Sequence, residues 1–363
     1  MKRLGKLAAV ILLVANPFFI GLMLFSAYSP CYNPEDHPIR ACFGMAFPIF
    51  AVVNLCFLIA WLFVAYKFAI IPFIAFLFCI PQLGVSFPIN SKTKKENIPA
   101  GHIKFLSYNI MGFDASENHK ENPILKYIAE SEADIICLQE YLTKNTPYLT
   151  QKQIEEALKI YPYKNIQRIG NKGSGNHIAC YSKFPILSAN RLSYPSVNNG
   201  SVVYSIKIGE DTVTVINNHL ESNKLTAEDK KIYREMLKSP EAKRVKSGAI
   251  QLIQKLGEAQ ALRAPQARAV AAEIAKRTNK YTIVCGDFND TPISYTHRLI
   301  AKNMNDAFVT SGRGLGVSYN QNRFYFRIDN ILVSKNLKAY NCTVDRSIKD
   351  SDHYPIWCYI LKR

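Results

Sequence analysis

Side chains that can hold a metal ion or move a proton recur at the ends of short apolar segments in the chain beyond residue 100. They are acidic, amide and imidazole residues: Asn109, Glu140, His219, Asp287, Asn289, Asp329, Asp352 and His353. Any one of them is explained equally well by turn chemistry, because Asn and Asp satisfy the backbone of turns. Together they supply hard oxygen ligands and no cysteine cluster, which suits magnesium or calcium better than zinc. A histidine next to a carboxylate suits acid–base chemistry near neutral pH.

Short apolar strands are expected to position these side chains. The segments with strand character are 103–108, 134–139, 178–181, 202–208, 212–217, 281–285, 327–333 and 356–361. A long helical stretch is predicted from about Ala227 to Lys276, with breaks near Pro240 and Pro265. Short strands mixed with helices indicate an α/β or α+β domain.

Six motifs follow one another in this part of the chain. They are FLSYN at 105–109, IICLQE at 135–140, NNHL at 217–220, GDFN at 286–289, IDNI at 328–331 and SDH at 351–353. In this order they resemble the endonuclease/exonuclease/phosphatase family, which includes pancreatic-type deoxyribonucleases, apurinic-site endonucleases, neutral sphingomyelinases and inositol polyphosphate phosphatases. The resemblance covers about residues 102–363. It implies a four-layer α/β (α+β) sandwich, in which two mixed β-sheets are flanked by helices and the active site lies at one edge.

The resemblance also implies a metal site. Glu140 would be the principal ligand, with Asn109 and Asp352 close by. The expected ion is Mg²⁺, with Mn²⁺ or Ca²⁺ as alternatives. Such an ion polarises a phosphoryl oxygen and stabilises the negative charge that develops on it.

The remaining motif residues take catalytic roles by the same resemblance. His353 would act on the attacking water, with Asp329 as its orienting carboxylate. Asp287 would position or activate the nucleophile, so the general base is either His353 or Asp287. Asn289, together with Asn109, would bind the substrate phosphate. His219 would stabilise the transition state or assist the leaving group.

The substrate is left open among phosphodiesters. The segment at 285–292, CGDFNDTP, lacks the Trp that precedes Gly-Asp in inositol polyphosphate phosphatases, which disfavours that branch. The formal net charge of +17 favours polyanions or acidic membranes. The expected activity is therefore phosphodiester hydrolysis, as by a nuclease. The alternatives are a lipid-headgroup phosphodiesterase of the sphingomyelinase type or a non-catalytic membrane-tethered module, and no protein partner can be inferred.

The amino-terminal third is apolar enough to enter a lipid bilayer. An apolar run from Leu7 to Tyr28 is long enough to cross as a helix, and the run from Ala41 to Pro88 is long enough for two more spans. We therefore predict transmembrane helices near 7–28, 43–66 and 68–88, a linker at 91–101 and a catalytic domain at 102–363.

Charge flanking these runs predicts their orientation. Lys2, Arg3 and Lys6 precede the first span, and such residues stay on the cytoplasmic side. Lys67 would mark a cytoplasmic turn between the second and third spans. Three spans then place the catalytic domain of this multi-pass protein on the non-cytoplasmic face, whereas an even number of spans would invert that placement.

Overall fold

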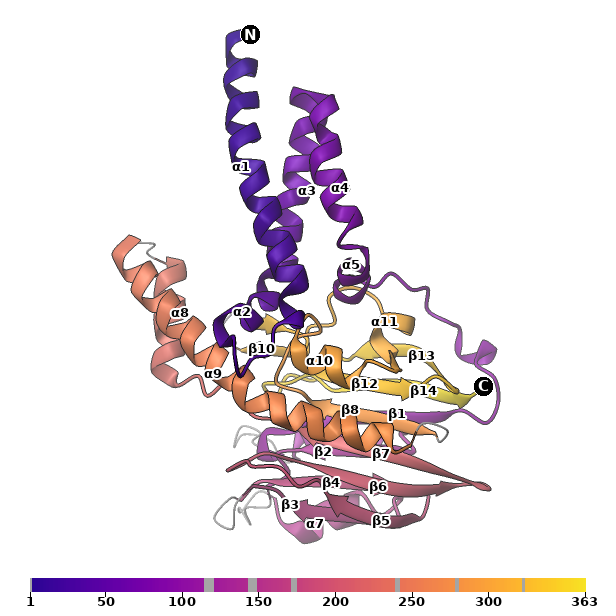
Figure 1. The fold of residues 1–363 in the computed structure, drawn as a ribbon. Helices are drawn as coiled ribbons and strands as arrows, with labels where there is room; N and C mark the ends of the chain where they lie inside the picture. Colours follow the sequence, from indigo (N-terminus) through magenta and orange to yellow (C-terminus); the bar gives the residue numbers. More distant parts are fainter. Residues whose placement is uncertain are drawn as a thin grey trace.

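The structure is a computed structural model that describes residues 2–113, 121–142, 149–170, 175–238, 242–277, 281–321 and 324–363 (Figure 1). The helices α1–α5 project from one side of a β-rich domain, and the carboxyl terminus lies within that domain. The two parts of the chain anticipated from composition are therefore spatially distinct.

The amino-terminal part contains two helices that are long and apolar enough to cross a membrane. They are α1 (Lys2–Tyr28) and α3 (Phe47–Val64), and the short helix α2 (Pro38–Cys42) leads into α3. Their outer surfaces expose Val14, Phe18 and Phe63, as a helix in contact with lipid would.

Between α1 and α3, a buried polar contact accompanies apolar packing. The side-chain amide of Asn16 donates to Asn54 Oδ1 at 3.2 Å, and the indole N–H of Trp61 donates to Asn16 Oδ1 at 3.0 Å. Interhelical hydrogen bonds of this kind hold helices together where apolar burial supplies no driving force.

The segment at 68–88, predicted as a third span, is bent in the structure. This segment forms α4 (Ile70–Leu77) and α5 (Ile80–Ser86), which are bent by 71° at the break between them. Pro81 lies in the first turn of α5. Its ring has no N–H to donate to the carbonyl of Leu77 and would clash with that carbonyl in a continuous helix.

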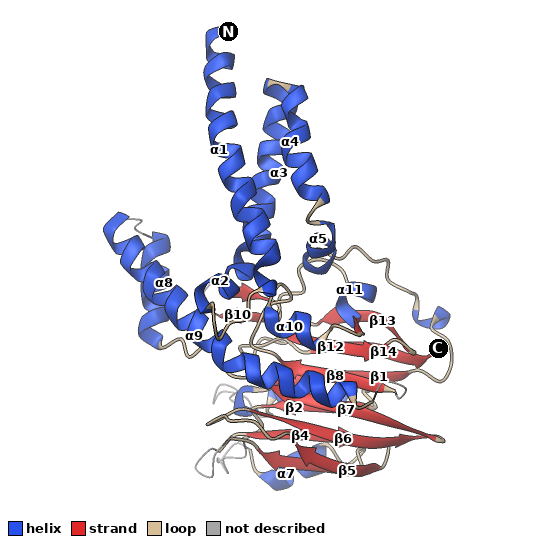
Figure 2. Ribbon diagram, in the orientation of Figure 1, coloured by secondary structure: helices blue, strands red, loops and turns tan. Residues whose placement is uncertain are grey.

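The β-rich domain contains two six-stranded mixed sheets (Figure 2). The first has the order β13-β14-β1-β2-β4-β3: Leu337–Val344, Ile356–Lys362, Ile103–Asn109, Ile135–Gln139, His177–Ser182 and Tyr163–Arg168. The second has the order β5-β6-β7-β8-β12-β9: Ile186–Arg191, Gly200–Ile208, Asp211–His219, Thr282–Asp287, Asp329–Ser334 and Met304–Asp306. Strand β1 is parallel to β2 and β7 is parallel to β8, whereas the other pairs are antiparallel.

Apolar layers join these sheets to each other and to the helices. Phe105, Cys137 and Ile283 belong to the core shared by both sheets. The helices α6 (Pro123–Glu130) and α7 (Gln151–Ala157) pack on the outer face of the first sheet. Part of α9 (Ala242–Ala275) and α10 (Tyr295–Ile300) cover the second sheet. The predicted four-layer sandwich of two mixed sheets flanked by helices is confirmed.

The long helical stretch differs from expectation at one of its two prolines. It consists of α8 (Ala227–Lys238) and α9, and α9 continues through Pro265 without ending. Ala264 and Ala267 on either side of this proline are buried, so packing on the sheet holds the helix where its hydrogen bond is lost. The predicted break near Pro240 lies outside the described residues.

The amino-terminal helices pack directly on the β-rich domain. Arg268 of α9 forms an ion pair with Glu35 at 2.7 Å, and the guanidinium of Arg327 donates to the carbonyl of Val85 at 3.3 Å. Gly44 lies so close to the backbone of Ile293 that an added Cβ would be only 1.8 Å from its carbonyl oxygen. This approach requires glycine and fixes the domain beneath α1 and α3.

A buried charge cluster supports the same junction. Asp306 forms an ion pair with Arg327 at 3.0 Å and accepts a hydrogen bond from His297 at 3.0 Å. Its other oxygen accepts the backbone N–H groups of Phe308 and Val309, which begin α11 (Ala307–Ser311). Burial opposes ionisation of Asp306, but Arg327 and His297 outweigh it and hold the pKa of this carboxyl below its usual range.

We expect Asp306→Asn to lower the free energy of unfolding by about 3–5 kcal/mol, because it leaves the Arg327 guanidinium buried without its counter-charge. Thermal unfolding of the full chain in detergent would measure the change. The control is Glu156→Gln, since Glu156 forms an ion pair with Lys159 that is exposed on both sides. Equal stability of the two variants would contradict a supporting role for the cluster.

Candidate active site

The strands of both sheets end at one edge, where the motif residues meet. Asn109 ends β1 and Glu140 directly follows β2, its parallel neighbour. In the second sheet, the pairing register places His219 of β7 beside Asp287 of β8, and Asp287 beside Asp329 of β12. Residues far apart in the sequence therefore become neighbours because of strand order and register alone.

Asn109 connects the two sheets at this edge. Its side-chain amide donates to Glu140 Oε1 at 3.1 Å and to Asp287 Oδ2 at 3.1 Å. His219 Nε2 lies 3.5 Å from the same Glu140 oxygen and 3.8 Å from Asp287 Oδ2. These side chains form one compact cluster. It contains two of the predicted metal ligands, Asn109 and Glu140, together with the predicted catalytic residues His219 and Asp287.

His353 and Asp329 form the predicted pair at the other side of Asp287. His353 Nδ1 lies 2.7 Å from Asp329 Oδ2, and its Nε2 lies 3.7 Å from Asp287 Oδ2. Asp329 is itself held by the hydroxyl of Ser318, which accepts its backbone N–H at 3.0 Å. A carboxylate at Nδ1 fixes the orientation of the imidazole and leaves Nε2 facing the cluster.

The pKa values of Asp287 and His353 are both raised, but for different physical reasons. Burial raises the pKa of Asp287 to about 6, although His353 and His219 oppose the rise. For His353, burial alone would lower the pKa, but the carboxylates of Asp329 and Asp287 outweigh it and raise the pKa well above its usual value. The two carboxylates therefore favour the protonated imidazole, a preference that a divalent ion bound in the same cluster would weaken.

The GDFN motif adopts a backbone that few sequences tolerate. Gly286 has φ +115°, and a Cβ there would lie 2.0 Å from the carbonyl oxygen of Asn218. Asn289 has a φ of 52°, in the left-handed region. Its backbone N–H donates to Asp287 Oδ1 at 2.7 Å, and its side-chain amide donates to the carbonyl of Leu220 at 2.9 Å. Asn289 thus holds Asp287 in place as well as bordering the site.

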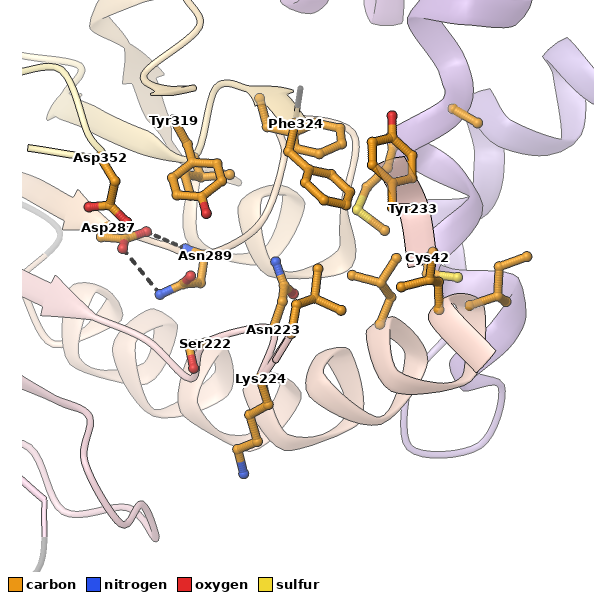
Figure 3. A pocket seen from close by; sticks show the side chains of 18 of the residues that line it. Cys42, Ser222, Asn223, Lys224, Tyr233, Asp287, Asn289, Tyr319, Phe324 and Asp352 are labelled. Atoms are coloured by element: carbon orange, nitrogen blue, oxygen red, sulfur yellow. Dashed lines mark hydrogen bonds between the residues drawn. The ribbon is translucent and has the colours of Figure 1, made fainter. Parts of the chain in front are cut away.

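The cluster has the chemistry of a cation site. Ligand atoms of Asp287, Asp329 and His353 lie within 4.8 Å of one another, and Asp329 Oδ1 is buried with no hydrogen-bond partner in the described part of the chain. The ion pairs that the described residues form with Glu140, Asp287 and Asp329 involve only His219 and His353. Excess carboxylate oxygen in a buried cluster fits a hard divalent cation. A cavity opens at the cluster, and Asp352 lines it next to Asp287 (Figure 3).

Two supporting residues near the cluster could not be recognised from the sequence. Tyr319, on the hairpin β10 (Tyr319–Gln321) and β11 (Phe324–Phe326), places its ring 5.1 Å from the ring of His353. Asn176 lies with its amide nitrogen 3.2 Å from His219 Nδ1. Asn176 lies next to strand β4, and neither Asn176 nor Tyr319 belongs to any of the six motifs.

Residues 263–266 of α9 support the loop that follows His219. Arg263 donates to the carbonyl of Glu221 at 2.8 Å and to Asn223 Oδ1 at 2.9 Å. The side-chain oxygen of Gln266 accepts the backbone N–H of Glu221 at 2.8 Å. These residues act through the loop and do not reach the carboxylate cluster themselves.

Solved structures with the same fold share little sequence with this chain. An endonuclease/exonuclease/phosphatase from Beutenbergia cavernae is 13% identical with a TM-score of 0.51, and covers 72% of each chain. A humanized D. rerio TDP2 is 15% identical with a TM-score of 0.50, covering 72% of this chain and 99% of its own. The human Nocturnin catalytic domain with bound sulfate is 16% identical with a TM-score of 0.50, covering 73% and 95%. No curated protein matches the chain.

Two family models match consecutive parts of the sequence. Residues 9–86 match a domain of unknown function (DUF8431), which coincides with the apolar amino-terminal helices. Residues 106–353 match the Endonuclease/Exonuclease/phosphatase family, and this match includes all of the motif residues in the cluster. The chain therefore belongs to the endonuclease/exonuclease/phosphatase family.

Proposed function

We propose that this protein is a membrane-anchored phosphoesterase that requires a divalent metal ion and hydrolyses phosphodiester bonds. The observation that carries the proposal is the amide of Asn109, which joins Glu140 and Asp287 beside the His353–Asp329 pair. A carboxylate-rich metal site adjacent to an oriented imidazole is the equipment that phosphoester hydrolysis needs.

Glu140, Asn109 and Asp352 would hold the ion, with Asp287 beside them. A divalent ion there supplies positive charge against the phosphoryl oxygens. Mg²⁺ suits this oxygen-rich set, and Mn²⁺ or Ca²⁺ are the alternatives.

The chain's own groups divide the proton transfers. Burial raises the pKa of Asp287 to about 6, which suits a group that accepts the proton of the attacking water near neutral pH. His353, oriented by Asp329, donates a hydrogen bond to the phosphoryl group. His219 is placed to assist the leaving oxygen, since its Nε2 faces both Glu140 and Asp287. The choice between two candidate bases therefore favours Asp287.

Membrane anchoring and sidedness are further parts of the proposal. The segment between α1 and α3 contacts the catalytic domain through Gly44 and Glu35, so the carboxyl end of α1 and the active site lie on the same side. The amino terminus and the turn that contains Lys67 lie at the far end of the helices (Figure 1). If Lys2, Arg3 and Lys6 stay in the cytoplasm, the active site is outside it.

We expect Glu140→Gln to lower magnesium-dependent hydrolysis by about 100-fold or more while the fold persists, because the substitution keeps the size and removes the charge. The purified full chain would be assayed with magnesium against plasmid DNA, RNA and phospholipid vesicles, with circular dichroism as the test of folding. The control is Glu130→Gln, at an exposed end of α6. Full turnover by a folded Glu140→Gln protein would contradict the assignment, and inactivity of the unmodified chain on all phosphodiesters would favour a non-catalytic module.

Asp329 and His353 should behave as a unit. We expect Asp329→Asn and His353→Ala each to lower kcat/KM by about 100-fold or more, and the double variant to be scarcely worse than His353→Ala alone. The reason is that Asp329 acts through the imidazole to which it is hydrogen-bonded. Losses that multiply in the double variant would show that the two residues act independently.

Protease added to intact cells, or to spheroplasts where an outer membrane is present, should digest the catalytic domain. The expectation follows from the shared side of the α1 carboxyl end and the active site. A cytoplasmic protein measured in the same samples reports whether the membrane stayed closed. Digestion of the catalytic domain only after lysis would place the active site in the cytoplasm.

A further inference from the structure

A cavity of about 480 Å³ extends from the catalytic cluster to the amino-terminal helices. We propose that this groove binds the apolar tail of a phosphoester lipid and places the headgroup phosphate at the carboxylate cluster. The proposal rests on the proposed phosphodiesterase function and adds the substrate class. A volume of this size lies within the usual range for sites that enclose a small ligand.

One end of the groove is the catalytic site itself. Its polar wall consists of Glu140, His219, Asp287, Asn289, Asp352 and His353. Figure 3 shows Asp287, Asn289 and Asp352 together at this end, with Tyr319 beside them. A phosphate bound here would therefore have the groove open next to it.

Beyond Ser222, Asn223 and Lys224, the rest of the groove is mostly apolar. Leu252, Ile253 and Leu256 of α9 line one wall. Phe324 of the β10–β11 hairpin lines another wall, and its ring stacks on that of Tyr233 with centroids 4.1 Å apart. Figure 3 shows Phe324 and Tyr233 on the side of the groove away from Asp287. Hydrocarbon is the ligand chemistry that gains most from such walls.

The far end of the groove is formed by the segment proposed to enter the bilayer. Phe43, Met45 and Ile49 line the cavity, and Ile49 belongs to α3, which is apolar enough to cross a membrane. Ile49 is 64% exposed and Val52, on the same helix, is 53% exposed. The groove is thus continuous with the surface of α3 that would face lipid. A lipid could bring its phosphate to the cluster while its tail passed from the bilayer to the groove without entering water.

The same groove is poorly suited to a nucleic acid strand. Strands are bound along basic grooves in which aromatic faces are free to stack on bases. Lys224 is the only Lys or Arg among the described residues that line the cavity, and it forms an ion pair with Glu221 at 3.0 Å. The rings of Tyr233 and Phe324 stack on each other. These observations favour a lipid over a polynucleotide in this groove.

A chain-length series tests the proposal. The full chain in lipid nanodiscs with magnesium would be given p-nitrophenyl alkyl phosphates with ethyl, butyl, hexyl and octyl groups, so that the reacting diester stays the same. Each methylene that leaves water for the groove should raise kcat/KM by up to about fourfold, until the groove is filled. If the ethyl ester is hydrolysed but kcat/KM does not change with chain length, the lipid assignment is overturned and the phosphodiesterase proposal stands. Failure to hydrolyse any phosphodiester would overturn both.

Matched variants on α9 locate the effect. Ile253→Gln places an amide in the groove wall and should remove most of the dependence of kcat/KM on chain length. Ile250→Gln is the control, because Ile250 lies on the same helix, is 48% exposed and does not line the cavity. Equal chain-length dependence in the two variants would place the tail elsewhere. Plasmid DNA cleaved faster than the octyl ester, with no effect of Ile253→Gln, would show a nuclease instead.

A second measurement does not depend on turnover. A long-chain phosphodiester with a diazirine in its tail would be photolysed with the Glu140→Gln protein in nanodiscs, and the labelled peptides would be identified by mass spectrometry. Labelling within residues 249–256 and at Phe324, reduced in the Ile253→Gln background, is the expected result. Labelling confined to the exposed surfaces of α1 and α3 would overturn the proposal.

Discussion

Asn109 donates both hydrogens of one amide to carboxylates that belong to different sheets. Glu140 follows a strand of the first sheet and Asp287 ends a strand of the second, so this single side chain sets the separation of two acidic groups across the sandwich. Asp287 is buried and Glu140 is partly exposed, and two carboxylates that share one amide donor repel each other. The arrangement is stable only if donors, imidazoles or a cation share the negative charge. The positions of His219, His353 and the predicted metal ligands around Asp287 follow from that constraint.

A buried polar network behind Asn109 keeps the sheets in the register that this geometry requires. The amide of Gln139 donates to Asn217 Oδ1 at 2.6 Å, and the amide of Asn217 donates in turn to the carbonyl of Leu138 at 3.3 Å. The first residue lies on β2 and the second on β7, so these bonds also cross the sandwich. Apolar side chains alone would let the sheets slide with little penalty, whereas a displaced network would leave buried polar groups without partners. The same network thus supports both the fold and the site.

Much of this arrangement could be predicted from the sequence, because the catalytic residues follow directly from strands. Glu140 and Asp287 come at the ends of apolar segments whose lengths are typical of strands, and parallel neighbours bring such ends to one edge. The strand register could not be read in the same way, and neither could Tyr319, which reaches His353 from a hairpin without a recognisable pattern. The effect of a proline depends on what holds the helix around it. Pro81 lies in the first turn of α5, just after the bend from α4, whereas Pro265, where a break was predicted, is tolerated because α9 is held against the sheet on both sides of it.

The contact between the amino-terminal helices and the catalytic domain could not be predicted from the sequence either. It depends on close approach of two backbones at glycines, which leaves no periodic pattern in the sequence. Gly44 leaves room for the backbone of Ile293. Gly257 allows α9 to lie close to Pro38, because a Cβ at position 257 would be only 3.0 Å from the carbonyl oxygen of Pro38. A Cβ at Gly44 would force the two parts apart, and one at Gly257 would require a shift of a few tenths of an ångström at Pro38. The ion pair between Arg268 and Glu35 lies at the same junction. If α1 and α3 cross a bilayer as proposed, these contacts fix one height and one orientation of the domain above it, whereas a flexible tether would allow many. They are also what brings Met45 and Ile49 to the groove that ends at Asp287, so the path from the apolar helices to the carboxylates exists only while the junction is closed.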